Sequence, residues 1–124
     1  MRYVCFVVAL LLVPILSSLA AAAEKRVALV IGNSAYIETT KLANTRNDAT
    51  DFGNALKRLG FDVLEGVDLD KRAMERLVRQ FGVKVVGADI AFFFYAGHGL
   101  QVSGENYLVP IDAKLEMPIL SRVA

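Results

Sequence analysis

The sequence predicts an α/β domain built around a parallel sheet. Three apolar segments with the composition of β-strands lie at residues 26–32, 61–65 and 88–95. Two segments with apolar residues at helical spacing separate them. Strands that alternate with helices pair in parallel, because each helix carries the chain back across the sheet in a right-handed crossover. We therefore expect the order strand, helix, strand, helix, strand.

The first strand and helix are predicted from one apolar run and the pattern that follows it. Residues 26–32 are continuously apolar and rich in β-branched side chains, which is typical of a strand buried on both faces. After a polar, turn-like stretch over 33–41, residues 45–48 resemble a capping box that opens a helix. Gly60 ends this helix, as glycine often does just past a helix. Its expected buried face is Ala49, Phe52, Ala55, Leu56 and Leu59.

The second strand, the second helix and the third strand are predicted from similar patterns. Residues 61–65 predict a half-exposed strand, and Asp70 is a suitable N-cap for the next helix. Gly82 is expected to end that helix. Residues 88–95 are the strongest strand pattern in the chain. The expected buried face of the second helix is Ala73, Met74, Leu77, Val78 and Phe81.

Beyond the third strand, the sequence no longer alternates strands with helices. The apolar segments 100–102 and 107–109 flank the polar residues 103–106, which predicts a β-hairpin. Residues 110–113 turn the chain away, and Pro118 opens a last helix.

The N-terminal segment predicts export. Arg2 gives a positive start, residues 4–16 are apolar, and the alanines at 20–23 supply the small residues that a signal peptidase requires. The apolar core is shorter than the roughly 20 residues that cross a bilayer, although an uncleaved anchor stays an alternative. We therefore expect a signal peptide at 1–23, a single domain at 24–124, and a periplasmic or secreted product without membrane contact after cleavage.

Charge and cysteine content exclude several classes of function. Loss of Arg2 leaves 13 basic and 13 acidic residues, so no charge excess favours nucleic acid or anionic lipid as a partner. The only cysteine is Cys5, inside the predicted signal peptide. The cleaved chain would therefore lack disulfides, thiolate metal sites and a thiol nucleophile.

Chemistry is expected beyond the carboxyl ends of the strands, at residues 32–34, 66–68 and 97–99. His98 is the only histidine, and the glycines on both sides leave space around its imidazole. An imidazole takes up and returns a proton near neutral pH. The alternative is a histidine that only satisfies a hydrogen bond in a turn. The position at a strand end and the neighbouring glycines favour the catalytic interpretation.

Three other polar features at this edge have structural explanations beside functional ones. The segment around Asn33 lacks the glycine spacing of a nucleotide-binding loop, so we predict that Asn33 is a turn residue. Asp68 and Asp70 have the spacing of a metal-binding pair, but no further ligands accompany them, and we predict no metal site. Asp48 either interacts favourably with the helix dipole or lines a substrate pocket.

Five segments in this order resemble the caspase and metacaspase family of cysteine endopeptidases, in its bacterial branch. They are residues 26–33, 47–49, 59–61, 93–99 and 106–110. The segment around the histidine is the most specific of them, and together they cover almost the whole predicted domain. The resemblance implies a three-layer, caspase-like parallel sheet with flanking helices.

The resemblance also implies roles for particular residues. His98 would act with a cysteine located after a fourth strand, and the backbone N–H of Gly99 would be one oxyanion-hole donor. An acidic residue at the position of Asp48 would help a pocket to accept Arg or Lys from a peptide or protein substrate. No resident cofactor or metal is implied, and the sequence carries no information on activation by calcium.

The departure from the family pattern is the missing nucleophile. The family's cysteine lies about 50 residues after its histidine, whereas only 26 residues follow His98 in this chain of 124, and none is cysteine. We therefore expect the N-terminal portion of a catalytic domain, truncated before the fourth core strand and inactive by itself. The third strand would then be an open, apolar edge that favours a strand-pairing partner or self-association.

Two further functions stay open beside the protease portion. One is a non-catalytic, caspase-like binding module that acts through partner pairing. The other is an unrelated exported α/β binding protein whose likeness to the family is accidental.

Overall fold

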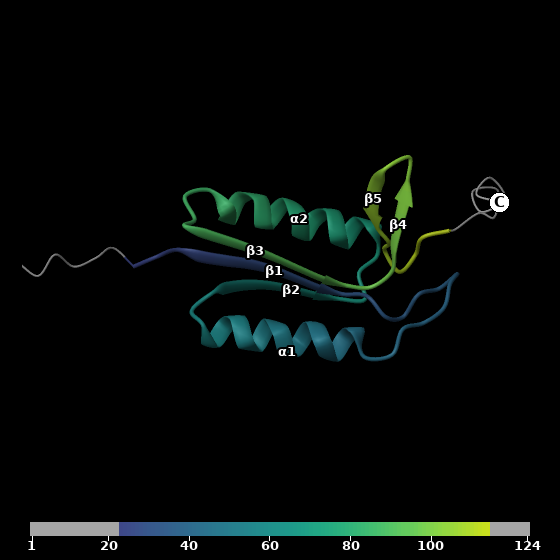
Figure 1. The fold of residues 1–124 in the computed structure, drawn as a ribbon, viewed down its shortest axis with the longest axis horizontal. Helices are drawn as coiled ribbons and strands as arrows, with labels where there is room; N and C mark the ends of the chain where they lie inside the picture. The colour runs from purple at the N-terminus through teal and green to yellow at the C-terminus, as the bar shows by residue number, and fades with distance from the viewer. Residues whose placement is uncertain (1–22, 115–124) are drawn as a thin grey trace, which may run out of the picture.

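The structure is a computed structural model that describes residues 23–114. All but the last residue of the predicted signal peptide, and the helix expected at Pro118, lie outside the described residues. Within them the chain forms a layered α/β unit followed by a hairpin (Figure 1). The elements are β1 Arg26–Gly32, α1 Thr45–Arg58, β2 Asp62–Val67, α2 Lys71–Val85, β3 Ile90–Ala96, β4 Gly99–Val102 and β5 Glu105–Leu108.

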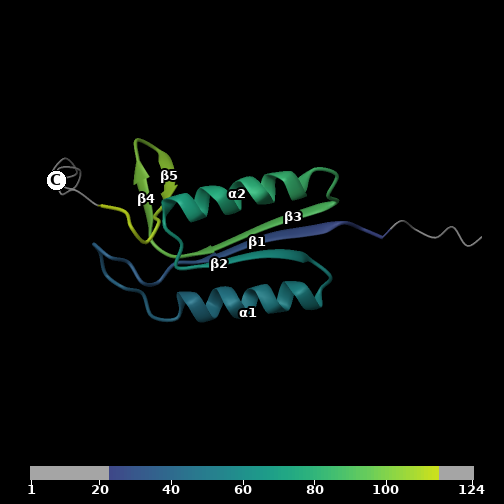
Figure 2. The ribbon, with the colours of Figure 1, turned by 180° about the vertical axis from the view of Figure 1, so that it is seen from behind.

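The predicted parallel sheet is confirmed, with the strand order β2-β1-β3. The two helices lie on opposite faces of the sheet, as the front and back views show (Figures 1 and 2). β1 is therefore covered on both faces, and its residues 27–31 are at most 1% exposed. The second hairpin strand pairs antiparallel with the first in a separate two-stranded sheet.

The core forms mainly between β1 and α1. Ala28 and Val30 on β1 pack against Ala49 and Leu56 of α1. The ring of Phe52 extends this contact by stacking on two β3 rings, those of Phe92 and Phe94, at centroid distances of 5.6 and 4.3 Å. The opposite face is covered less completely. Of the face predicted for α2, only Met74 is buried, and Val78 is 48% exposed.

The start of α1 differs from the prediction. The capping box expected at 45–48 is wrong, because Thr45 is the first helical residue and Asn44 is the N-cap, with a positive φ of 71°. The Thr45 hydroxyl donates instead to the carbonyl of Asn33 at 3.0 Å. The backbone N–H of Asp48 bonds the Asn44 carbonyl at 2.8 Å. The hydroxyl that would have capped the helix thus ties it to the end of β1.

The glycine that ends α1 acts as predicted. Gly60 has a φ of 83°, and its N–H bonds the Lys57 carbonyl at 3.0 Å. The next N–H, of Phe61, reaches back to the Leu56 carbonyl at 3.1 Å. This pair of bonds is the Schellman arrangement. Leu59, expected on the buried face, lies at this turn and is 61% exposed.

Two other predicted boundaries need correction. Gly82 does not end α2, which continues to Val85 before Gly87 adopts a φ of 72°. A single glycine at an exposed helical position costs only about 1 kcal/mol, which does not stop a helix that packs elsewhere. The hairpin is tighter than expected, since only Ser103 and Gly104 form its turn. Both have positive φ values, as a type I′ turn requires.

Neither helix in residues 23–114 combines the length and apolar character that a membrane crossing requires.

Two glycines should respond in opposite directions to a methyl group. A Cβ on Gly32 would lie 2.6 Å from the Ala49 Cβ and 2.7 Å from the Thr45 carbonyl oxygen, whereas a Cβ on Gly82 meets nothing within 4 Å. We expect Gly32→Ala to destabilise the fold by about 1–3 kcal/mol and Gly82→Ala to stabilise it by about 0.5–1 kcal/mol. Denaturant unfolding measures both changes. Equal effects of the two substitutions would contradict the close contact of α1 with β1.

Candidate active site

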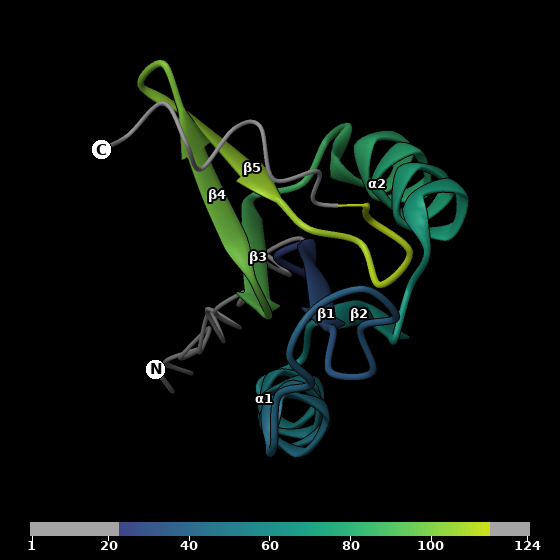
Figure 3. The same ribbon diagram turned by 90° about the vertical axis from the view of Figure 1, so that its right-hand side faces the viewer.

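The three strand ends that sequence analysis selected meet at one edge of the sheet. The N–H of Asn33 donates to the Ala96 carbonyl at 2.8 Å, and the N–H of Asp68 donates to the Gly32 carbonyl at 2.9 Å. The end of β1 is thereby bonded to the ends of both neighbouring strands. Figure 3 looks onto this edge, from which the β4–β5 hairpin projects.

Asn33 is not the turn residue that was predicted. Its side chain is fully buried, and its Oδ1 accepts a hydrogen bond from the Leu69 N–H at 2.9 Å. Its Nδ2 donates to the Val109 carbonyl at 3.2 Å. One amide therefore joins β1 to the segment after β2 and to the segment after the hairpin.

Asp68 and Asp70 hold local structure. The Asp68 Oδ1 accepts hydrogen bonds from the N–H groups of Ser34 and Ala35, at 2.8 and 2.9 Å, and its Oδ2 pairs with Arg46. Asp70 caps α2 by accepting from the Ala73 N–H at 2.8 Å. Within residues 23–114 no three His, Cys, Asp or Glu side chains gather closely enough to hold a metal ion.

The surroundings of Asp68 also change its titration. Burial by itself would raise the pKa of this carboxyl. The hydrogen bond from Arg46, the bonds from the Ala35 and Ser34 N–H groups, and the positive charge of Arg46 together outweigh burial. The pKa of Asp68 is therefore lowered from its usual value.

The imidazole of His98 is held in one orientation. Its Nε2 lies 2.7 Å from the carbonyl oxygen of Thr40. A carbonyl oxygen only accepts, so Nε2 carries the proton of the neutral ring and Nδ1 carries the lone pair. The ring also packs on that of Tyr36, with centroids 4.5 Å apart and planes tilted by 50°. Among the described residues no hydrogen bond occupies Nδ1, so this atom is available to take a proton.

The backbone of His98 is bonded on both sides by tyrosines, of which Tyr36 is buried and Tyr95 is half-buried. Its N–H donates to the Tyr36 hydroxyl at 2.7 Å, and its carbonyl accepts from the Tyr95 hydroxyl at 2.7 Å and from the Val109 N–H at 3.1 Å. The two hydroxyl oxygens lie 3.2 Å apart. Burial, followed by the interaction with Tyr36, raises the pKa of Tyr95, so its hydroxyl keeps its proton.

The absence of a side chain at Gly97 has a steric cause, besides the flexibility that its sequence position suggested. A Cβ there would lie 2.5 Å from the Tyr95 hydroxyl oxygen and 2.6 Å from that of Tyr36. The two hydroxyls thus occupy the space that any other residue at position 97 would need.

Within residues 23–114, no acceptor is found for the backbone N–H of Gly99. Because the Val109 N–H bonds the His98 carbonyl, the facing residues Gly99 and Leu108 form a non-hydrogen-bonded pair of the hairpin. The N–H of Gly99 is therefore directed away from β5. It remains available for a negatively charged oxygen, as the predicted oxyanion role requires.

Asp48 lies at the same edge but apart from the histidine network. It belongs to the first turn of α1, which packs over the end of β1 through Ala49, and its side chain is exposed. No ion pair or side-chain hydrogen bond joins its carboxylate to another residue in the described part of the chain. The structure is thus compatible with both predicted roles, the helix-dipole role and the substrate-pocket role.

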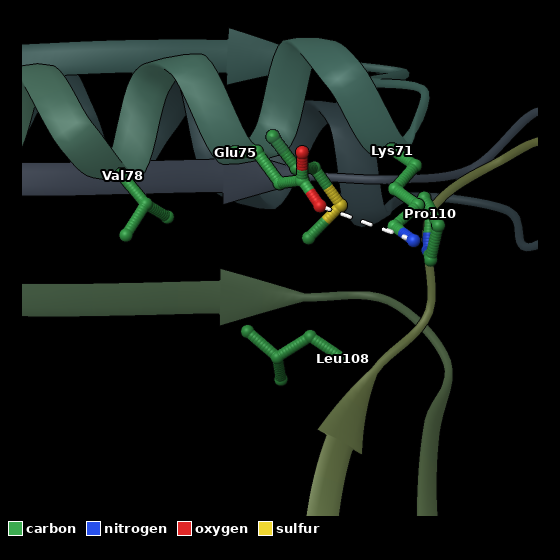
Figure 4. A pocket seen from close by; sticks show the side chains of 6 residues that line it. Lys71, Glu75, Val78, Leu108 and Pro110 are labelled. Atoms are coloured by element: carbon green, nitrogen blue, oxygen red, sulfur yellow. Dashed lines mark ion pairs between the residues drawn. The ribbon is translucent and has the colours of Figure 1, made fainter.

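A separate apolar pocket of about 300 Å³ lies between α2 and the hairpin. In Figure 4, Val78 of α2 faces Leu108 of β5, and the Lys71–Glu75 ion pair of 4.0 Å lies near Pro110. His98, Gly99 and Asp48 are not among its lining residues. The pocket and the predicted site are therefore different places on the molecule.

Sequence analysis missed the residues that hold His98, namely Tyr36, Thr40 and Tyr95. Tyr95 was placed at the end of an apolar strand and in the segment 93–99 that resembles the family, but no role was predicted for its side chain. Tyr36 lay in a stretch described as polar and turn-like. An aromatic residue so soon after a buried strand was the one available sign that this loop packs inward.

Comparison with known proteins supports the resemblance found in the sequence. A family model described as the caspase domain matches residues 25–123. The chain is 35% identical over 91 residues to mucosa-associated lymphoid tissue lymphoma translocation protein 1 of Homo sapiens and to its Mus musculus homolog. These alignments cover 73% of this chain and 11% of each relative. The chain therefore spans about a tenth of the length of these curated relatives.

The Asp68 network should make stability depend on acid pH. A carboxyl whose pKa is lowered in the folded state stabilises the fold above its unfolded pKa of about 3.9, and this contribution is lost as the pH falls through the folded value. We expect Asp68→Asn to be less stable than the unmodified chain by about 1 kcal/mol at pH 7. Denaturant unfolding at a series of pH values should show this difference shrinking below pH 4. A difference that stays constant down to the lowest pH would contradict the assignment, and Arg46→Gln should reduce the same pH-dependent difference.

Proposed function

The chain belongs to the caspase-domain family, and on that premise we propose that it supplies the catalytic histidine of a cysteine-type endopeptidase. The observation that carries this proposal is the environment of His98. Its Nε2–H is bonded to the Thr40 carbonyl, while Nδ1 remains available at the carboxyl edge of the sheet. A ring held in this way is prepared to act as a base through one defined atom.

In the proposed reaction His98 transfers protons and a cysteine thiolate is the nucleophile. Nδ1 of His98 takes the proton of a cysteine thiol, and the thiolate attacks the carbonyl carbon of the scissile peptide. The imidazolium then returns its proton to the leaving amine, and water hydrolyses the acyl-enzyme. Throughout, the bond from Nε2–H to the Thr40 carbonyl keeps the ring from turning.

Gly99 supports the same reaction. Its N–H points away from the hairpin ladder and is proposed to donate to the oxyanion that forms on the attacked carbonyl. Because His98 and Gly99 are adjacent, one short segment delivers both the base and one oxyanion donor.

The nucleophile is proposed to lie outside these 124 residues. The only cysteine in the chain is Cys5, which we propose to be part of a signal peptide at 1–23. By the family pattern the partner cysteine follows the histidine by about 50 residues. Export to a periplasmic or extracellular location, and membership of the bacterial branch of the family, belong to the same proposal.

Asp48 is proposed to select the substrate. Its exposed carboxylate at the edge of the sheet has no side-chain partner among the described residues. It is therefore able to pair with an Arg or Lys side chain of a peptide whose scissile bond lies at His98. The proposed substrate class is thus a protein or peptide cleaved after a basic residue.

A second candidate function is a non-catalytic binding module that pairs with a partner strand. The observation that favours it is β3, which within residues 23–114 pairs only with β1. Its residues Ile90, Phe92 and Phe93 are 38%, 37% and 47% exposed. A long, uncharged edge of this kind favours the addition of another strand, from a partner or from a second copy.

Labelling by an active-site probe tests the catalytic proposal. The chain should be combined with the cysteine-bearing segment of its gene or of its partner, and treated with an electrophilic peptide probe ending in Arg. We expect labelling of that cysteine, and a loss of turnover of at least about 10³-fold in His98→Ala. The 124-residue chain alone should hydrolyse no Arg or Lys fluorogenic peptide.

Two outcomes would contradict the catalytic proposal. Turnover by the chain alone that vanishes in His98→Ala would show that the nucleophile lies within it. Full labelling and turnover in folded His98→Ala would show that the reaction does not need His98.

The role of Asp48 is tested separately. We expect Asp48→Asn to lower kcat/KM for Arg and Lys substrates by about 10–100-fold, because a charge-assisted contact is lost. Asp51→Asn is the matched control, since Asp51 is another exposed acid on α1. Equal effects of the two substitutions would show that general surface charge, and not a specific contact at Asp48, attracts basic substrates.

A further inference from the structure

We propose that Tyr36 and Tyr95 are positioning residues, which together set the directions of the His98 imidazole and of the Gly99 N–H. The inference rests on the proposed function for its catalytic meaning, but the geometry behind it is independent of that function. It starts from a set of hydrogen bonds that begins and ends on the backbone of His98.

The direction of each bond follows from the groups involved. The His98 N–H can only donate, so the Tyr36 oxygen accepts at 2.7 Å. The Tyr95 oxygen lies 2.7 Å from the His98 carbonyl oxygen and 3.1 Å from that of Val109, so its proton must point to these acceptors. The 3.2 Å contact between the hydroxyls is then a donation from Tyr36 to Tyr95. These bonds form a closed ring in which all donors point the same way round. Each bond has a proton of its own.

Tyr36 controls the imidazole. Its ring packs against that of His98 at 4.5 Å, and its hydroxyl holds the backbone of the same residue. The tyrosine is only 1% exposed, so it cannot swing away without opening the core. Thr40, whose carbonyl holds Nε2, lies four residues further along the same loop. That loop is anchored in turn, because Asp68 bonds the N–H groups of Ser34 and Ala35.

Tyr95 controls the oxyanion donor. In a trans peptide the carbonyl of one residue and the N–H of the next point in opposite directions. The Tyr95 hydroxyl bonds the His98 carbonyl, and thereby sets the plane of the peptide that carries the Gly99 N–H. The Val109 N–H supports the same carbonyl from the hairpin side. One tyrosine thus positions the base, and the other positions the donor beside it.

Because His98 is the only histidine, labelling histidine with ¹⁵N gives a single imidazole and a single histidine amide in the NMR spectrum of the full chain. In the unmodified chain we expect the tautomer with the proton on Nε2. In Tyr36→Phe the ring is kept and the hydroxyl is lost. The His98 amide should then exchange with solvent at least about tenfold faster, and the tautomer should become mixed.

The matched control is Tyr107→Phe, which removes a hydroxyl from a tyrosine that is 52% exposed and for which no hydrogen bond to His98 is found. It should leave both readouts unchanged. Tyr95→Phe tests the other end of the ring. In a sample labelled with ¹⁵N at glycine, it should move the Gly99 amide resonance while the Tyr36–His98 bond persists. If Tyr36→Phe does not fold, Tyr95→Phe serves as the test of the proposal.

The proposal is overturned if folded Tyr36→Phe keeps the tautomer and the amide exchange rate of His98 in the unmodified chain, or if folded Tyr95→Phe keeps its Gly99 amide resonance. In the protein completed with its cysteine, Tyr36→Phe should lower kcat and leave KM unchanged, as expected for a residue that acts through the base. If the NMR changes occur but no cysteine is ever labelled, the positioning role stands and the proposed protease function fails.

Discussion

The structure depends on the need to satisfy every buried hydrogen-bonding group where the parallel strands end. Backbone groups leaving a sheet lose their ladder partners, and burying them unpaired is costly. The side chain of Asn33 meets this need by bonding Leu69 and Val109 at once. Val109 in turn bonds the His98 carbonyl. The segment that carries the histidine is therefore bonded to buried residues, although the imidazole itself lies at the edge.

The elements that sequence analysis predicted well are those set by local patterns. β1 has the expected bounds because seven successive residues suit burial on both faces, and Asp70 caps α2 as its position suggests. The predictions were wrong where contacts elsewhere in the fold outweighed the local sequence pattern. The Thr45 hydroxyl bonds Asn33 instead of capping its own helix. Gly82 does not interrupt α2, since a local cost of about 1 kcal/mol is too small to end a packed helix.

The same division applies to the site. The position of His98 at a strand end follows from the alternation of strands and helices, and its glycine neighbours are visible in the sequence. Apart from Tyr95, its supports are not visible there, because they come from residues far away in the chain. Thr40 is 58 residues from the histidine it orients, Tyr36 is 62 residues away, and Asn33 and Val109 are 76 residues apart. No local spacing rule links such pairs.

The group that orients the imidazole is a main-chain carbonyl, not a side-chain carboxylate. Every amino acid carries that carbonyl, so replacing the side chain at position 40 leaves the acceptor in place. What the arrangement cannot tolerate is a change in the path of the loop, because one inserted or deleted residue would move the oxygen away from Nε2. Evolution of this support is thus constrained in loop length and shape far more than in residue identity.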